Sequence, residues 1–208
     1  MVLLGVFCGL RIGTISDIKT GTLLNAAPDP ASPGSRLINV GPGACPPVAT
    51  KNGVNGQVSI PETVFKRVMT YATSSRRSRR LAIASRGDAD LVFLTTRGKP
   101  YCNHGTDSSG AIRTLTRNLR LAAEASGNSE LSKFKFHQTR ATFATRLTAA
   151  LLEKHNVNNV LAFVKRAMLH SKEATTLLYI RFVEQHPLKS AAADAFTRDF
   201  MGTLDEAD

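Results

Sequence analysis

The sequence predicts a predominantly helical α+β domain with a small β-hairpin sheet, and three observations support this fold class. Apolar residues recur at helical spacing in several segments of the 208-residue chain. Two Asn-Gly pairs lie between short β-prone runs in VATKNGVNGQVSIP, residues 48–61. The hydrophobic content of 42% is sufficient for one sizeable core. We therefore expect a single domain over residues 1–208.

The first sixty residues combine a helix, an irregular loop and a hairpin. Apolar periodicity predicts a helix over residues 1–18, which loses definition near Lys19. Residues 20–47 are rich in Gly, Pro, Ala and Ser and contain one β-prone run, RLINV. The Asn-Gly pairs of residues 48–61 predict a hairpin or tight loop with Lys51 at its entrance.

Three more elements are predicted between Pro61 and Gly127. Pro61 suits the first turn of a helix, and Gly127 suits the end of a second helix over residues 108–125. ADLVFLTT, residues 89–96, predicts a short buried strand, and RGKP after it predicts a turn. The apolar residues expected to face inward are Val64, Phe65, Val68, Met69 and Ala72 in the first helix and Ile112, Leu115, Leu119 and Ala122 in the second.

Positive charge dominates the chain. It carries 27 Lys and Arg against 16 Asp and Glu, a net charge of +11 that commonly reflects a polyanionic partner. Nucleic acid is the leading candidate, because no apolar run approaches the ~20 residues of a membrane-spanning helix. Residues 66–80 and the second helix each hold a group of cations that could contact phosphate, although a solvated charged face explains each residue equally well. The candidate DNA contacts are Arg76, Arg77, Arg79, Arg80, Arg113, Arg117 and Arg120.

The two ends of the chain differ in character. MVLLGVFCGL lacks the positively charged segment and the small-residue cleavage site of a signal peptide, so we expect it to form a buried helix. Residues 194–208 hold five acids and one Arg, and a small amphipathic helix is predicted over residues 195–201.

The cysteines indicate neither a disulfide framework nor a zinc site. Cys8, Cys45 and Cys102 are odd in number and widely spaced, and none belongs to a CxxC pair. A reducing cytoplasm fits this usage best.

FKFHQTRATFATRLTAALL, residues 134–152, predicts a helix with two cationic side chains near its start. Residues at i and i+3 share a helix face, with Cβ atoms about 5–6 Å apart. His137 and Arg140 can therefore contact the same group. Arg140 continues the core-facing stripe of Ala144, Leu147 and Leu151, and its guanidinium is therefore expected to point inward. A buried guanidinium requires an anion, which is either an internal carboxylate or a bound phosphate.

A second polar pair lies in KRAMLHSKEATTLLYIRF, residues 165–182. In a continuous helix His170 and Tyr179 would be separated by roughly 900° of rotation and ~13 Å along the axis, on opposite faces. Ser171 is a favoured N-cap, and Glu173 would then lie in the first turn of a new helix. A helix break at this point can bring Tyr179 back toward His170.

Taken together, these segments resemble the tyrosine recombinases, the phage integrase family. HQTRATFATRL followed by MLHSKEATTLLY is similar to the C-terminal signature of that family. GLRIGTISDI resembles its first arginine motif, TKNGVNGQVSIP its hairpin lysine segment, and DADLVFLTTRGKP the strand and turn that follow. The resemblance implies the recombinase catalytic-domain fold. It assigns as catalytic residues Arg11, Lys51, His137, Arg140, His170 and the nucleophile Tyr179.

The resemblance also implies a reaction and its partners. Family members are site-specific recombinases that transfer a DNA phosphodiester onto tyrosine, use neither metal nor other cofactor, and assemble as tetramers on duplex DNA. It further implies a cytoplasmic, nucleoid-associated protein of a mobile genetic element. Arg11 stands so early that the first catalytic-domain helix and the N-terminal DNA-clamping domain are expected to be absent from this chain.

The sequence departs from the family pattern at several positions, and other interpretations remain open. Thr14 stands where the family has an acid, Leu169 where it has Gly, and Thr139 precedes Arg140 in place of Leu. Each candidate also has an ordinary structural interpretation, such as a solvated turn lysine for Lys51. The two rival functions are an inactive DNA-binding remnant of an integrase and a type IB topoisomerase, which normally has Lys in place of His137.

Overall fold

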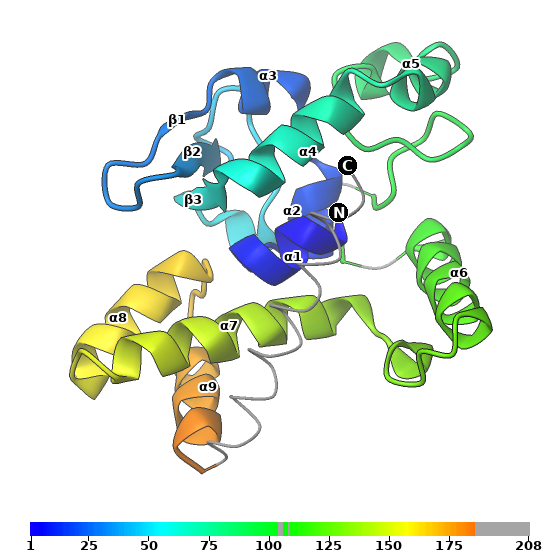
Figure 1. Cartoon of the computed structure of the whole chain (residues 1–208). Helices are drawn as coiled ribbons and strands as arrows, with labels where there is room; N and C mark the ends of the chain where they lie inside the picture. Colours follow the sequence, from blue (N-terminus) through cyan, green and yellow to red (C-terminus); the bar gives the residue numbers. More distant parts are fainter. Residues whose placement is uncertain (104–105, 108, 186–208) are drawn as a thin grey trace. The chain divides into compact units, whose positions relative to one another are not determined.

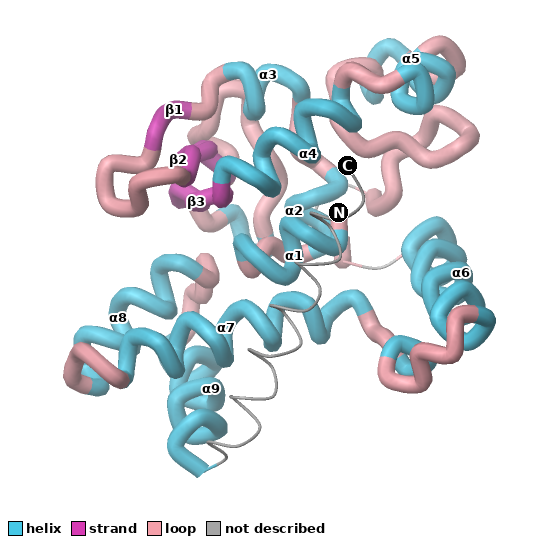
Figure 2. The backbone as a smooth tube through the Cα atoms, viewed as in Figure 1, coloured by secondary structure: helices cyan, strands magenta, loops and turns pink. Residues whose placement is uncertain are grey.

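The computed structural model describes residues 1–103, 106–107 and 109–185. The chain forms two compact units, of which the first is Met1–Arg140 and the second begins at Ala141. Strands occur in one small sheet, and the rest of the regular structure in the described ranges is helical (Figure 2). The acidic helix predicted within residues 194–208 lies outside the described residues. The prediction of a single domain stays a prediction.

The N-terminal region forms two short helices, so the prediction of one helix over residues 1–18 is wrong. α1 spans Val2–Cys8 and α2 spans Ile12–Ser16. Gly9 ends α1 with a φ of 63°, a left-handed conformation that glycine adopts without steric cost. Arg11 is then extended, with φ −70° and ψ 148°, as the N-cap of α2. The break places Arg11 at a helix start and not in the middle of a helix.

The sheet is three-stranded and antiparallel in the order β1-β2-β3. β1 is Ala27–Pro28, β2 is Ser35–Val40 and β3 is Gly56–Pro61, and α3, Thr20–Leu24, precedes them. β2 contains the predicted RLINV strand, and its register with β3 runs from Ser35 opposite Pro61 to Val40 opposite Gly56.

The two Asn-Gly pairs do not form a two-residue hairpin. Residues 41–55 connect β2 to β3, with a β-bridge between Gly41 and Val48 and a 3₁₀ turn at Lys51–Gly53. Asn52 takes the left-handed conformation of that turn, with φ 63°. Asn55 instead accepts a hydrogen bond from the backbone N–H of Gly43 at 2.8 Å, which ties the long connection together.

α4, Glu62–Ala72, begins directly after Pro61, as predicted, and packs against β2 and β3 (Figure 1). Val64, Phe65 and Val68 are buried, which confirms the centre of the predicted apolar face. The largest fully buried side chains of this unit are Leu4, Leu10, Ile15, Ile18, Ile38, Val40, Val48, Ile60, Val64, Val92 and Leu94.

α5 spans Ser75–Leu81 and is followed by a 3₁₀ turn at Arg86–Asp88. The segment after this turn is buried at its centre but irregular. Leu91, Val92, Phe93 and Leu94 are buried as expected, yet only isolated bridges form, between Lys19 and Leu91 and between Leu94 and Pro100. The predicted strand at residues 89–96 is therefore wrong. An apolar run alone cannot supply the neighbouring strand that a ladder requires. The turn at RGKP is confirmed, since the N–H of Thr95 donates to the carbonyl of Lys99 at 2.8 Å.

α6, Gly110–Ala125, is capped by Ser109, whose hydroxyl accepts from the N–H of Ile112 at 3.1 Å. Its buried face is narrower than predicted. Ile112 is buried, but Leu119 is 38% exposed and Ala122 is exposed, while Ala123 is buried instead. The helix packs against the short 3₁₀ turn Leu131–Lys133, which covers only part of the apolar face.

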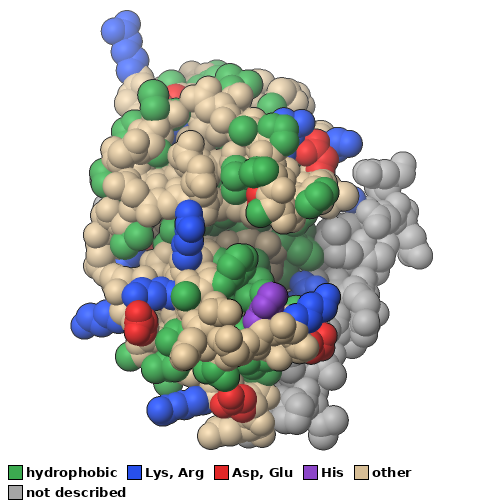
Figure 3. Space-filling view, turned by 90° about the vertical axis from the view of Figure 1, so that its left-hand side faces the viewer, with side chains coloured by type: hydrophobic (Ala, Val, Ile, Leu, Met, Phe, Trp, Pro, Cys, Tyr) green, Lys and Arg blue, Asp and Glu red, His purple; other side chains and the backbone are tan. Residues whose placement is uncertain are grey.

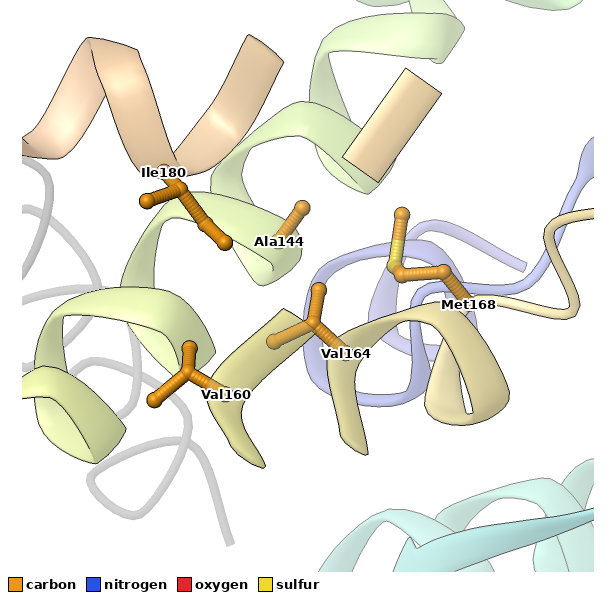
Figure 4. Close-up of a cluster of buried hydrophobic side chains, with 5 residues drawn as sticks. All are labelled: Ala144, Val160, Val164, Met168 and Ile180. Carbon is orange, nitrogen blue, oxygen red and sulfur yellow. The ribbon is translucent and has the colours of Figure 1, made fainter. Parts of the chain in front are cut away.

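The second unit is helical over its described residues. α7, Phe136–Leu152, passes from the first unit into the second and is followed by α8, Val157–Ala167, and α9, Glu173–Gln185. The predicted helix break near Ser171 is present. Figure 4 shows the five buried side chains of this core, which come from the three helices and, for Met168, from the C-cap of α8: Ala144, Val160, Val164, Met168 and Ile180.

None of the helices in the described ranges combines the length and the apolar character of a membrane span.

Candidate active site

A pocket of about 540 Å³ lies in the first unit, and six of its thirteen lining residues are Lys or Arg. Arg11 reaches it from the start of α2, and His137 and Arg140 reach it from the first turns of α7. The structure thus brings together three of the six predicted catalytic residues. The full lining is Leu10, Arg11, Ile12, Asp107, Ile112, Arg113, Thr116, Arg117, Arg120, Lys135, Phe136, His137 and Arg140.

Arg140 points inward, as its position in the apolar stripe predicted, and only 3% of it is exposed. One Nη1 hydrogen of its guanidinium is donated to the carbonyl of Gly9, the residue that ends α1. The sequence predicted an anion as the partner of this guanidinium. The carbonyl of Gly9 is neutral, but it accepts a hydrogen bond as an anion would. The bond fixes the orientation of the guanidinium relative to the Arg11 loop.

Close packing between α1 and the first turns of α7 supports that contact. A Cβ on Gly5 would lie against Thr139 Oγ1, inside van der Waals contact, and 2.8 Å from Thr139 Cβ. The absence of a side chain at Gly5 therefore allows the two helices to approach. Thr139 is 3% exposed, and its hydroxyl donates to the carbonyl of Phe136 at 2.7 Å.

His137 lies on the exposed side of α7, in the field of several charges. Partial burial, followed by the cations of Arg140 and Arg11, lowers the pKa of its imidazole below the ordinary value. The nearby carboxylate of Asp107 acts in the opposite direction and is weaker than these effects. The ring is consequently neutral at neutral pH, which is the form that can accept a proton.

Asp107 is a pocket residue that the sequence analysis missed. Its Oδ1 accepts a hydrogen bond from the backbone N–H of Gly13 at 3.1 Å, two residues after Arg11. Thr14, the position where the family has an acid, is 4% exposed. The sequence signal for Asp107 was weak, because an aspartate ninety-four positions away can reach Gly13 only through the tertiary fold.

Lys51 is exposed on the turn between β2 and β3 and is not part of the pocket lining. Its charge is among those that lower the pKa of His137. The chain leading to it is held by Asp17, which accepts from the N–H of Ala49 at 2.6 Å and from Lys19 Nζ at 2.9 Å. Lys19 is thus engaged in an ion pair with Asp17, and the catalytic role of Lys51 stays a prediction.

His170 and Tyr179 lie together in the second unit. Their rings are nearly parallel, with centroids 6.2 Å apart and an interplanar angle of 9°. This confirms the prediction that a helix break brings Tyr179 back toward His170. His170 is 7% exposed, and its Nδ1 is hydrogen bonded to Thr176 Oγ1 at 2.9 Å. That His170 and Tyr179 form one active site with the residues of the Arg11 pocket stays a prediction.

The candidate DNA contacts divide into exposed and structural residues. Arg77 and Arg80 are each 8% exposed, so their prediction as phosphate contacts is wrong. Arg77 Nη2 donates to the carbonyl of Leu91 at 3.0 Å, and Arg80 Nη1 donates to the carbonyl of Leu94 at 2.6 Å. These two arginines satisfy carbonyls of a buried segment that forms isolated bridges but no ladder. Their neighbours Arg76 and Arg79 are exposed.

The arginines of α6 remain candidates. Arg113, Arg117 and Arg120 all line the pocket, and Arg120 also donates from Nε to the carbonyl of Phe134 at 2.7 Å.

On the face shown in Figure 3, Lys and Arg side chains are spread among apolar and polar ones without forming one continuous patch.

No cluster of three or more His, Cys, Asp or Glu side chains suitable for a metal ion occurs among the residues described.

Two solved structures have the same fold as this chain. A structure of the XerH site-specific recombinase, bound to a palindromic difH substrate in a post-cleavage complex, matches 92% of this chain with a TM-score of 0.58 and 18% identity. A structure of the Tn1549 transposon integrase, in complex with a circular intermediate DNA, matches 86% of this chain with a TM-score of 0.54 and 16% identity.

The chain therefore has the fold of a tyrosine recombinase catalytic domain, as the sequence predicted. It spans 44% and 52% of the length of the two matched chains. No protein-family model matches the sequence. No curated protein matches it either.

Proposed function

We propose that this protein is a tyrosine-type site-specific recombinase that cleaves and rejoins duplex DNA through a 3′-phosphotyrosine intermediate. The observation that carries the proposal is the shared pocket of Arg11, His137 and Arg140, three residues assigned by motif and brought together by the fold. The fold shared with two DNA-bound recombinases supports it further.

The pocket has the chemistry of a phosphodiester site. A phosphate approaching a five-coordinate transition state gathers negative charge on its non-bridging oxygens, and guanidinium groups bind such oxygens bidentately. Such groups are effective when they are held in position before the reaction. The burial of Arg140 and its bond to Gly9 supply that preorganisation.

In this proposal the other catalytic residues carry out the attack on phosphorus and the departure of the 5′-oxygen. Tyr179 Oη attacks phosphorus, its proton passes to neutral His137, and the 5′-oxygen leaves with a proton from Lys51. His170 donates a hydrogen bond to a non-bridging oxygen. Because the phosphotyrosine bond conserves the energy of the phosphodiester, a 5′-hydroxyl can reverse the reaction without a cofactor. We expect the active assembly to be a homotetramer on DNA.

A trapping experiment tests the proposal. Duplexes that tile the DNA flanking the gene, each nicked next to a candidate cleavage position, would be incubated with the protein and resolved on denaturing gels. A recombinase forms a covalent protein–DNA adduct that disappears in Tyr179→Phe. Equal DNA binding without an adduct would identify an inactive DNA-binding remnant. Relaxation of any supercoiled plasmid without site preference would identify a topoisomerase.

A further inference from the structure

The backbone around His170 is fixed by the end of α8. The N–H of Leu169 donates to the carbonyl of Arg166, and the N–H of His170 donates to the carbonyl of Lys165, both at 3.0 Å. This is the hydrogen-bond pattern of a Schellman helix end. Leu169 adopts the left-handed conformation that the pattern requires, with φ 50°. His170 therefore leaves the helix in one defined direction.

The side chain of His170 is fixed by a different residue, Thr176 of α9. The distance from Nδ1 to Thr176 Oγ1 is 2.9 Å, and the two residues are 7% and 0% exposed. A buried hydrogen bond of this kind is expensive to remove, because a partner left unsatisfied keeps its desolvation penalty. Thr176 precedes Tyr179 by three positions and so shares its face of α9. One threonine thus connects the imidazole to the helix face that carries the phenol.

We propose that Thr176 is a positioning residue that selects the ring tautomer of His170. A neutral imidazole carries its proton on one nitrogen only, and a hydroxyl can pair with Nδ1 either as donor or as acceptor. The hydroxyl of Thr176 is fully buried, and Nδ1 is its one hydrogen-bond partner among the described residues, so donation to Nδ1 is the direction that satisfies the hydroxyl hydrogen. When the Thr176 hydroxyl donates to Nδ1, the proton of the neutral ring is held on Nε2. This tautomer can donate from Nε2 to a phosphate oxygen. The catalytic consequence rests on the proposed function, whereas the tautomer itself does not.

The tautomer can be measured in the free protein by NMR of ¹⁵N-histidine-labelled samples, with His170 assigned from the spectrum of His170→Gln. The wild type is expected to show unprotonated Nδ1 and protonated Nε2 above the titration range of the ring. Thr176→Val, which keeps the shape but removes the hydroxyl, is expected to shift both ring nitrogens toward a mixture of tautomers. Thr176→Ser keeps the hydroxyl and is expected to retain the wild-type pattern.

A matched control perturbs the same helix junction without touching His170. Lys165 and Glu173 form an ion pair of 2.8 Å across the break between α8 and α9. Glu173→Gln removes this exposed pair, and we expect the His170 ring signals to stay unchanged. An Nδ1–H tautomer in the wild type, or identical ring signals in Thr176→Val and wild type, overturns the proposal. The wild-type spectrum decides it even where Thr176→Val fails to fold.

Single-turnover cleavage of the nicked duplex supplies the second readout. Thr176→Val is expected to cleave roughly tenfold more slowly, the effect of losing one hydrogen bond to the reacting centre, with unchanged DNA affinity. Thr176→Ser should stay within about threefold of wild type. A wild-type rate in Thr176→Val would refute the catalytic part. Absence of any adduct in the wild type refutes the proposed function instead, and the ring signals still decide the role of Thr176.

Discussion

Gly5→Ala should destabilise the first unit by forcing α1 away from the start of α7. The added Cβ would meet Thr139 Oγ1 and lie 2.8 Å from Thr139 Cβ, whereas ordinary contacts begin near 3.4 Å. The helices must therefore separate by at least roughly 0.6 Å in a close-packed interior. Overpacking of this kind costs about 1–3 kcal/mol, and the higher helix propensity of Ala returns up to about 1 kcal/mol. We expect a net loss of about 1–2 kcal/mol.

Urea denaturation followed by far-ultraviolet circular dichroism measures this loss, since the chain contains no tryptophan. With a slope of about 2 kcal/mol per molar urea, the midpoint should fall by about 0.5–1 M. Gly87→Ala is the matched control, because no atom lies within 4 Å of the position its Cβ would take. This control should be neutral or stabilised by up to about 1 kcal/mol.

A double-mutant cycle locates the clash. Thr139→Ala removes the oxygen that the new methyl group meets, so Gly5→Ala should cost less in that background, with a coupling of about 0.5–3 kcal/mol. An unchanged midpoint in Gly5→Ala, or strict additivity with Thr139→Ala, would refute the close approach of α1 and α7.

Three further predictions concern the pocket and the buried arginines. Arg140→Ala should reduce adduct formation by about a hundredfold or more while lowering DNA affinity only modestly, because one phosphate contact among many is lost; an unchanged cleavage rate would remove Arg140 from the site. NMR titration should place the pKa of His137 below about 6.5, and Arg140→Gln should raise it because a neighbouring cation is removed. Accordingly, the neutral, proton-accepting form should persist below pH 6.5 and be lost as the pH falls further; a titration at or above 6.5 in the wild type would contradict this. Arg77→Ala should destabilise by about 1–3 kcal/mol in urea, because buried carbonyls lose their donor, whereas exposed Arg76→Ala should change stability by less than about 0.5 kcal/mol; equal effects in the two variants would refute the structural role of Arg77.

Local pattern was sufficient to predict much of this fold. Apolar periodicity located α4, α6 and α7, since residues three or four positions apart meet on one helix face whatever the rest of the chain does. The inward direction of Arg140 follows from the same geometry, and it is confirmed by the exposure of only 3%. The break between His170 and Tyr179 was also readable, because capping depends on residues adjacent in sequence.

Features that depend on distant partners were not readable. A run such as residues 89–96 becomes a strand only beside another strand, and in this fold Arg77 and Arg80 satisfy its carbonyls instead. The same limit applies to Asp107, whose partner lies ninety-four positions away. The apolar periodicity also could not distinguish the buried arginines of α5, which donate to backbone carbonyls, from the exposed arginines of the same short helix.

The sequence alone determined which reactive groups the chain carries and in what order, because residue identity and short-range spacing are properties of the chain itself. Tertiary structure decided which of them share a pocket, which arginines are withdrawn from the surface, and which threonine holds His170. Those outcomes depend on contacts between segments far apart in sequence, and such contacts exist only once the chain has folded.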